Sequence, residues 1–191
     1  MNLLEHFGNI DIYLFDQILR GRIAPGMRIV DAGCGYGRNV VYFLNEGYEV
    51  YGVDRDADAI ASLPANGNFH VASIEAMPFP DAFADVVIAH SVLHFASNDA
   101  HFQAMLAGLW RVLKPGGMLF TRLASTIGME HRMRHIEGRR YLLPDGSERY
   151  LVDEALLMAL TKGLGGKLLD PIKTTIVQDA RCMTTWVVGK T

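Results

Sequence analysis

The stretch that decides the fold is residues 31–39, which read DAGCGYGRN. An apolar run precedes it at 27–30, and the segment that follows, at 38–47, has apolar residues at helical spacing. Glycines have no Cβ atom, so such a backbone can turn sharply and approach a ligand beside the positive end of a helix. The stretch therefore predicts a strand, a ligand-binding loop and a helix, with a purely structural turn as the alternative.

The neighbours of this loop indicate which ligand it binds. A dinucleotide site needs GxGxxG, whereas the loop has GxGxG with Arg38 at the next position, and it lacks the lysine of a Walker loop. Asp31 precedes the loop and Asp54 ends the next apolar run. A carboxylate at that strand end can accept hydrogen bonds from both hydroxyls of a ribose. The competing role for Asp54 is the N-cap of the helix that follows.

Strands and helices are predicted to alternate along the rest of the chain. This alternation indicates an α/β fold in which a mostly parallel sheet is covered on both faces. Two β-rich runs near the C-terminus have no helix between them, so they predict an antiparallel hairpin at the sheet edge. The expected elements are helices at 10–20, 56–63, 98–113 and 153–162, and strands at 68–72, 84–89 and 118–124.

Composition narrows the class of protein. The chain has 191 residues, of which 50% are hydrophobic, so we expect a single domain over 1–191 with residues 1–24 as a helical cover. No apolar run approaches the roughly 18 residues of a membrane span and no signal peptide is apparent, which predicts a cytoplasmic protein without a membrane partner. Two cysteines and the spacing of the histidines predict no metal site. The net charge of −3 disfavours nucleic acid as a partner, and the oligomeric state is not indicated.

Five motifs occur in order between residues 27 and 124. Together they resemble the class I, Rossmann-like S-adenosylmethionine (SAM) dependent methyltransferases of the small-molecule type. The C-terminal run VQDARCMTTWVV is similar to the final hairpin of tellurite-resistance-type methyltransferases, which contains an Arg-x-Met-x-x-Trp pattern. The five motifs are DAGCGYG at 31–37, GVDRD at 52–56, ASIEAMPF at 72–79, FADVVIAHSVLHF at 83–95 and LWRVLKPGGMLF at 109–120.

The resemblance implies a three-layer fold around a seven-stranded sheet, with SAM as the cofactor. Many relatives have an aspartate at the position of Ser73, which accepts a hydrogen bond from the adenine amino group. Ser73 can accept such a bond through its hydroxyl, Ile74 can donate its N–H, and Glu75 is an alternative acceptor. The implied cofactor-binding residues are Asp31, Gly33, Cys34, Gly35, Asp54, Arg55, Ser73, Ile74 and His90.

SAM carries its methyl group on a sulfonium, so the protein mainly has to align a nucleophile for direct in-line displacement. The fourth motif contains AHSVLHF instead of an NPPY-type tetrapeptide, which disfavours methylation of adenine N6 in DNA. Ser91 and His94 are expected beside the methyl group. His94 is the candidate catalytic base, because an imidazole titrates near pH 6.5, and a hydrogen-bonded structural histidine is the alternative.

The segment 128–150 is long for a connection in a compact domain, and we interpret it as a possible lid or acceptor-binding insertion. Arginines can bind an anionic acceptor through forked hydrogen bonds, and a solvated surface is the alternative. The candidate acceptor-binding residues are Tyr13, Ser91, Arg132, Arg134 and Arg181. The expected function is methyl transfer from SAM to a small soluble acceptor. An RNA or protein methyltransferase and a non-catalytic SAM-binding regulator are the alternatives.

Overall fold

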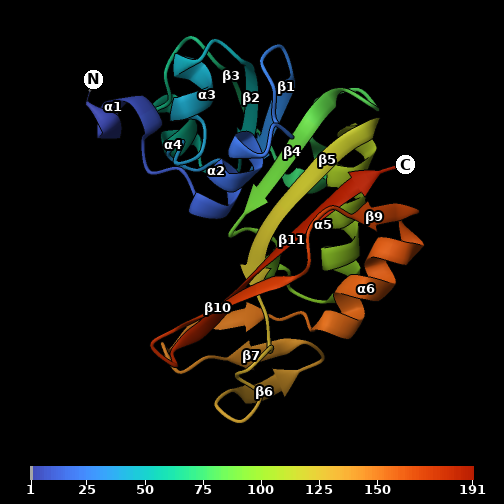
Figure 1. The fold of residues 1–191 in the computed structure, drawn as a ribbon. Coiled ribbons are helices and arrows are strands. Elements are labelled where there is room, and N and C mark those ends of the chain that lie inside the picture. The colour runs from blue at the N-terminus through green and yellow to red at the C-terminus, as the bar shows by residue number, and fades with distance from the viewer. Residues whose placement is uncertain (1) are drawn as a thin grey trace.

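The computed structural model describes residues 2–191 and is built around one eight-stranded sheet (Figure 1). The order along its main path is β10-β11-β5-β4-β1-β2-β3, and β9 pairs with β11. The five strands from β3 to β5 along this path are parallel, whereas β11 is antiparallel to β5, and β10 and β9 are antiparallel to β11. This confirms the α/β class and the C-terminal edge hairpin, and β9 is a strand beyond the expected seven. The strands are β1 (Arg28–Ala32), β2 (Glu49–Asp54), β3 (Asn68–Val71), β4 (Ala84–His90), β5 (Leu113–Ala124), β9 (Gly166–Leu168), β10 (Lys173–Val177) and β11 (Arg181–Lys190).

Helices cover both faces of the sheet because successive side chains of each strand point to opposite sides. In β4, Val86 and Ile88 belong to the core that contains α2 and α3 side chains, whereas Val87 and Ala89 belong to the core beneath α5 and α6. No helix within residues 2–191 combines the length and apolar character needed to cross a membrane. The helices are α1 (Leu3–Phe7), α2 (Ile12–Leu19), α3 (Val41–Asn45), α4 (Ala57–Ala61), α5 (Asp99–Val112) and α6 (Glu154–Gly163), with 3₁₀ turns η1 (Ile74–Ala76) and η2 (Leu93–Phe95).

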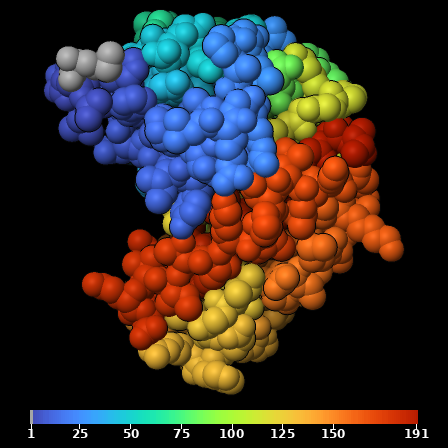
Figure 2. Space-filling model, viewed as in Figure 1, coloured from blue at the N-terminus to red at the C-terminus, as the bar shows by residue number. Residues whose placement is uncertain are grey.

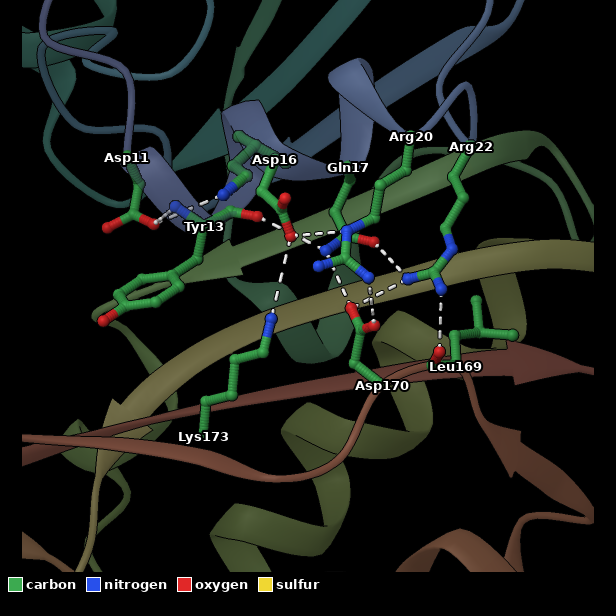
Figure 3. A network of polar contacts seen from close by, with 10 residues as sticks. Asp11, Tyr13, Asp16, Gln17, Arg20, Arg22, Leu169, Asp170 and Lys173 are labelled. Carbon is green, nitrogen blue, oxygen red and sulfur yellow. Dashed lines mark hydrogen bonds and ion pairs between the residues drawn. The ribbon is translucent and has the colours of Figure 1, made fainter.

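The N-terminal helix α2 is fixed to the C-terminal part of the chain by the carboxylate of Asp170. Asp170 is buried and accepts hydrogen bonds from Gln17 Nε2 at 2.9 Å, Arg20 Nη1 at 3.2 Å and Arg22 Nη1 at 2.8 Å (Figure 3). Arg22 also donates to the carbonyl of Leu169 at 2.9 Å. Figure 2 shows the blue N-terminal segment lying directly against the orange C-terminal part. The N-terminal segment that contains α2 and the C-terminal part of the chain therefore pack together as one continuous surface.

Residues 128–150 contain a three-stranded antiparallel sheet that the sequence analysis did not predict. Its strands are β6 (Arg134–Glu137), β7 (Arg140–Leu142) and β8 (Glu148–Tyr150), in the order β6-β7-β8. In Figure 1 this small sheet lies beyond the carboxyl end of β5, next to the β10-β11 hairpin. Leu143 and Leu151 pack on Ala124 in a small core of their own. The insertion thus forms a separate small sheet beside the edge of the main sheet where ligands bind in open α/β folds.

Candidate active site

The glycine loop follows β1 directly. Two of its positions, 33 and 35, require glycine for different structural reasons. Gly33 has a φ of 79°, and a Cβ there would lie 2.7 Å from Val92 Cγ2. Gly35 has a φ of 49° but meets no atom within 4 Å. Gly33 is therefore required by packing as well as by its backbone conformation. Gly35 leaves an open space into which a ligand can approach the backbone.

Asp54, at the end of β2, supports this loop. Its Oδ2 accepts the N–H of Gly35 at 2.8 Å, and its Oδ1 accepts the N–H of Asp56 at 3.0 Å. The N-cap of α4 is Asp56, whose Oδ1 accepts the N–H groups of Asp58 and Ala59. The alternative role of Asp54 as the helix cap is therefore wrong. Its carboxylate lies on a cavity wall, where a ribose can reach it.

Asp31 ends the apolar part of β1 and is 2% exposed. Its Oδ1 is buried without a hydrogen-bond partner among the described residues. Burial, and then the negative charge of Asp54, raise the pKa of Asp31 to about 7. Buried carboxylate oxygens are rarely left unpaired in proteins. A cationic group of a ligand at the glycine loop would supply the missing partner.

Cys34 also lies in this loop. With Gly35 it lines one of the cavities near the loop, which we call the third cavity, and the first and second are described below. Its thiol is buried, and burial followed by the charges of Asp31 and Asp54 raises its pKa far above the ordinary value. The thiol is therefore protonated and unsuited to act as a nucleophile. Its position beside the loop agrees with a binding role.

The first cavity has a volume of about 320 Å³ and lies between the glycine loop, the end of β2, η1 and α5. Arg55, Ile74 and Glu75 line it, whereas Ser73 does not. Glu75 Oε1 is bound by Arg55 Nη2 at 2.7 Å and by His101 Nε2 at 2.6 Å, and Oε2 is buried without a partner. Of the two acceptors that the sequence analysis left open, the structure places Glu75 on the wall.

The second cavity has a volume of about 360 Å³ and shares Ser91 and Phe95 with the first. Ser91 has a φ of 59°, and its N–H donates to the Arg122 carbonyl at 2.7 Å. Left-handed backbone at a residue other than glycine is costly and clusters at functional sites. Ser91 thus marks the boundary at which a molecule in one cavity would face a molecule in the other.

His94 lines the second cavity but is 6% exposed, and its Nδ1 accepts the N–H of Ala124 at 3.2 Å. Burial, followed by the nearby positive charges of Arg149 and Arg181 and by His90, lowers the pKa of His94 to about 4. The ring is therefore neutral at pH 7, and Nε2 carries the hydrogen because Nδ1 is an acceptor. Of the two roles that the sequence analysis left open, this arrangement favours a hydrogen-bonded histidine that can donate from Nε2 over a catalytic base.

His90, at the end of β4, borders both the second and the third cavity. Its Nε2 lies 3.2 Å from Oδ2 of Asp11, which also pairs with Arg122. Burial raises the pKa of Asp11, but the hydrogen bonds and charges of His90 and Arg122 outweigh it and lower the value to about 2. The sequence analysis missed Asp11 and Arg122. No local pattern brings these segments together.

The candidate acceptor-binding residues separate into two groups. Arg181 lines the second cavity. The Arg122 guanidinium carbon lies over the Tyr13 ring, 5.0 Å from the ring centroid. Arg132 pairs with Asp179 at 3.0 Å, and Arg134 is exposed on β6. Neither of these last two borders the second cavity, so their assignment to the acceptor site is not supported.

Besides Arg122, two further arginines, Arg38 and Arg149, line the second cavity and were not among the candidates. Arg149 belongs to the insertion, as do Leu143, Asp145 and Ser147 on the same wall. The interpretation of 128–150 as an acceptor-binding insertion includes Arg149, but the sequence does not specify which arginines of that segment turn inward. Arg38 was noted only as a departure from a dinucleotide fingerprint.

Comparisons with known proteins agree with this geometry. Residues 30–121 match the family model described as a methyltransferase domain. The chain is 34% identical over 146 residues to the malonyl-[acyl-carrier protein] O-methyltransferase of Enterobacter lignolyticus, covering 73% of this chain and 55% of that protein. It is 28% identical over 193 residues to a ubiquinone/menaquinone biosynthesis C-methyltransferase of Bordetella parapertussis, covering 89% and 72%. The chain spans about half the length of several curated relatives that it matches.

Solved structures share the fold. A SAM-dependent methyltransferase from Methanosarcina mazei superimposes with a TM-score of 0.76 at 19% identity, covering 91% of this chain and 96% of that one. The 1,6-didemethyltoxoflavin-N1-methyltransferase of Burkholderia thailandensis, with bound 1,6-didemethyltoxoflavin and S-adenosylhomocysteine, gives 0.70 at 19% identity, covering 93% and 76%. The region that matches the methyltransferase domain model, residues 30–121, contains the glycine loop and the ends of β2 and β4. Residues 30–121 thus match the methyltransferase domain model, and the chain has the fold of these solved structures.

Proposed function

We propose that this protein is an enzyme that transfers the methyl group of SAM to a small-molecule acceptor. The observation that carries the proposal is the unpartnered, buried Oδ1 of Asp31 beside a glycine loop that opens onto the first cavity. This donor set fits SAM, which has an ammonium group, a ribose and an adenine. When bound, SAM supplies a methyl group activated by a positively charged sulfur.

The residues of the first cavity, and those of the glycine loop and strand ends beside it, each have a distinct partner on such a cofactor. Asp31 would bind the ammonium group, and Asp54 would accept hydrogen bonds from the ribose hydroxyls. Glu75, through its free Oε2, would accept a hydrogen bond from the adenine amino group, with Ile74 as an apolar support. The backbone of Gly33, Cys34 and Gly35 would allow close approach, while Arg55 and His90 border the cofactor.

The second cavity is the proposed acceptor site, because it meets the first cavity at Ser91 and Phe95. A nucleophile held there would face the activated methyl group for direct in-line displacement. His94 would orient the acceptor by donating from Nε2. The insertion at 128–150 forms part of the wall through Leu143 to Arg149 and would shield the reaction from water. Two curated relatives are named as a malonyl-[acyl-carrier protein] O-methyltransferase and a ubiquinone/menaquinone biosynthesis C-methyltransferase, and these names support a small-molecule acceptor group.

A methyl-transfer screen tests this proposal. Purified protein and SAM would be incubated with a panel of small thiols, amines, phenols and carboxylic acids, and separately with RNA and protein acceptors, and release of S-adenosylhomocysteine would be measured. We expect turnover with at least one small acceptor, lost on Asp31→Asn. Turnover confined to RNA or protein acceptors would contradict the proposal. Cofactor binding without turnover of any acceptor would favour a regulatory role instead.

A further inference from the structure

The second cavity gathers arginines that have no carboxylate partner. Of the thirteen arginines in the chain, nine pair with a carboxylate within the described residues, and three of the other four line this cavity. Those three are Arg38, Arg149 and Arg181, and the fourth is the exposed Arg134 on β6. Outside this cavity, therefore, arginines within the described residues are paired with a carboxylate, and Arg134 is the exception.

The three arginines come from separate parts of the fold: the loop after β1, β8 and β11. Arg38 donates its Nε to the carbonyl of Asn9 at 2.8 Å, which leaves its terminal nitrogens available. Arg149 donates one hydrogen bond, from Nη1 to the carbonyl of Glu148. Its guanidinium lies 4.8 Å from the ring centroid of Phe95. Arg181 pairs with Val177 through its backbone, but within residues 2–191 its side chain makes no hydrogen bond or ion pair. Each side chain thus keeps donors for another molecule.

The negative charge on the same wall is insufficient to balance them. Asp145 is the one carboxylate that lines the cavity. Burial raises its pKa, but hydrogen bonds from Ser147 and the charges of Arg181 and Arg149 outweigh this and lower it, so Asp145 is ionised at neutral pH. Arg122, the fourth arginine on the wall, is already paired with Asp11. An excess of positive charge remains, and an anion would relieve it.

The rest of the wall is neutral or apolar. His94 presents a neutral ring, and Phe95, Leu143, Val177 and Met183 supply apolar surface. A cavity of about 360 Å³ has the size of a small-molecule site and cannot enclose a folded macromolecule. Guanidinium groups favour planar oxyanions, which accept two parallel N–H bonds.

On the basis of the proposed function, we infer that the methyl acceptor is a small acid. Its oxyanion is bound by Arg149 and Arg181, with Arg38 at the cofactor side, and its apolar body packs against Phe95 and Leu143. The oxyanion is a carboxylate or a phosphate ester. This assigns the arginines of the second cavity to substrate selection, separately from cofactor binding in the first cavity.

Calorimetric titration with matched acid and neutral probes tests this inference. One arm compares benzoate with benzamide, and a second compares phenyl phosphate with phenol, each with free protein and with protein saturated with S-adenosylhomocysteine. We expect at least one anion to bind about tenfold or more tightly than its neutral counterpart, since hydrogen bonds to charged groups are among the stronger ones. The arm that shows the preference identifies the oxyanion. Raising the salt concentration should weaken anion binding.

Three variants locate the effect. Arg149→Gln and Arg181→Gln should each reduce anion affinity about fivefold or more, whereas the matched control Arg134→Gln should leave it unchanged. S-adenosylhomocysteine affinity should stay constant in all three, which also shows that each variant is folded. Equal binding of anionic and neutral probes in both arms, or equal losses in all three variants, would overturn the inference. Failure of S-adenosylhomocysteine to bind, with the anion preference intact, would instead reject the proposed function.

Discussion

Asp11 and His90 lie 79 residues apart in sequence, and Asp11 Oδ2 and His90 Nε2 are 3.2 Å apart in the structure. The same carboxylate pairs with Arg122 and caps α2 by accepting the N–H of Tyr13 at 2.9 Å. Asp11 is 1% exposed, so these interactions are made away from water. The N-terminal cover is thereby joined to the ends of β4 and β5, which form the wall of the proposed acceptor site.

The first prediction concerns the charge of Asp11. Its partners lower its pKa from 3.8 to about 2, so its ionised form stabilises the folded state above about pH 4, and this contribution is lost as the pH falls towards 2. Asp11→Asn should therefore lower the free energy of unfolding by about 2 kcal/mol at pH 7. Urea denaturation of the wild type and the variant at pH 7 and at about pH 3 would measure the difference in their free energies of unfolding. This difference should be smaller in acid.

Asp56→Asn is the matched control, because Asp56 caps α4 at an exposed position and asparagine is a comparable cap. It should change the stability by less than about 0.5 kcal/mol. An Asp11→Asn protein as stable as the wild type at pH 7 would show that the network with His90 and Arg122 contributes nothing.

The second prediction concerns Asp31, whose pKa is raised to about 7 by burial and by Asp54. The folded state favours the neutral carboxyl, so the ligand-free protein should lose stability as the pH rises from about 4 to above 7. Asp31→Asn removes this cost and should make the ligand-free protein more stable at about pH 8. The same variant should bind S-adenosylhomocysteine at least about tenfold more weakly, because a charge-assisted bond to the ammonium group is lost.

Thermal denaturation and calorimetry over pH 5.5 to 8 would check both effects. Wild-type affinity should rise with pH as Asp31 ionises, and the Asn variant should lack this dependence. A variant with unchanged affinity would mean that the unpaired Oδ1 does not meet the ligand.

The third prediction separates the two glycines of the loop. Gly33→Ala places a Cβ 2.7 Å from Val92 Cγ2 at a left-handed position, so it should cost about 2 kcal/mol or more of stability. Gly35→Ala meets open space, so its cost should be limited to about 1 kcal/mol of backbone strain. It should nevertheless impair cofactor binding strongly, because the methyl group enters the space proposed for the ligand. Equal stability losses, or normal cofactor binding by Gly35→Ala, would contradict this assignment.

The fourth prediction concerns recognition of adenine. Glu75 lines the first cavity with a free oxygen, whereas Ser73 lies outside it. Glu75→Gln should weaken binding of S-adenosylhomocysteine about fivefold or more, and Ser73→Ala should change it less than twofold. A competition assay with adenosine against inosine should show a preference for adenosine that Glu75→Gln reduces. The reverse ranking of the two variants would restore the adenine contact to Ser73.

The sequence predicted much of the main sheet because several of its strands are buried apolar runs. β1, β2 and β4 followed from such runs, as did the helix before β5. The three strands β6 to β8 escaped prediction because much of their surface is exposed, and strands without a buried face lack the alternating pattern by which strands are recognised. β9 is three residues long and carries too little pattern to be recognised.

The cofactor side of the site was more predictable than the acceptor side. Asp31, Gly33, Gly35 and Asp54 lie within two local motifs, and the parallel pairing of β1 with β2 brings these motifs together. The acceptor cavity instead depends on contacts between distant segments, such as Asp11 with Arg122 and Arg149 with Phe95. The direction of each arginine of the insertion was set by the small sheet, which the sequence pattern did not reveal.

Titration of the purified protein with S-adenosylhomocysteine in a calorimeter tests the central claim most directly. The account predicts binding of one molecule per chain, weakened by Asp31→Asn and by Gly35→Ala, and the absence of comparable binding of a nicotinamide dinucleotide. Failure of both SAM and S-adenosylhomocysteine to bind the folded wild-type protein at millimolar concentration would contradict it.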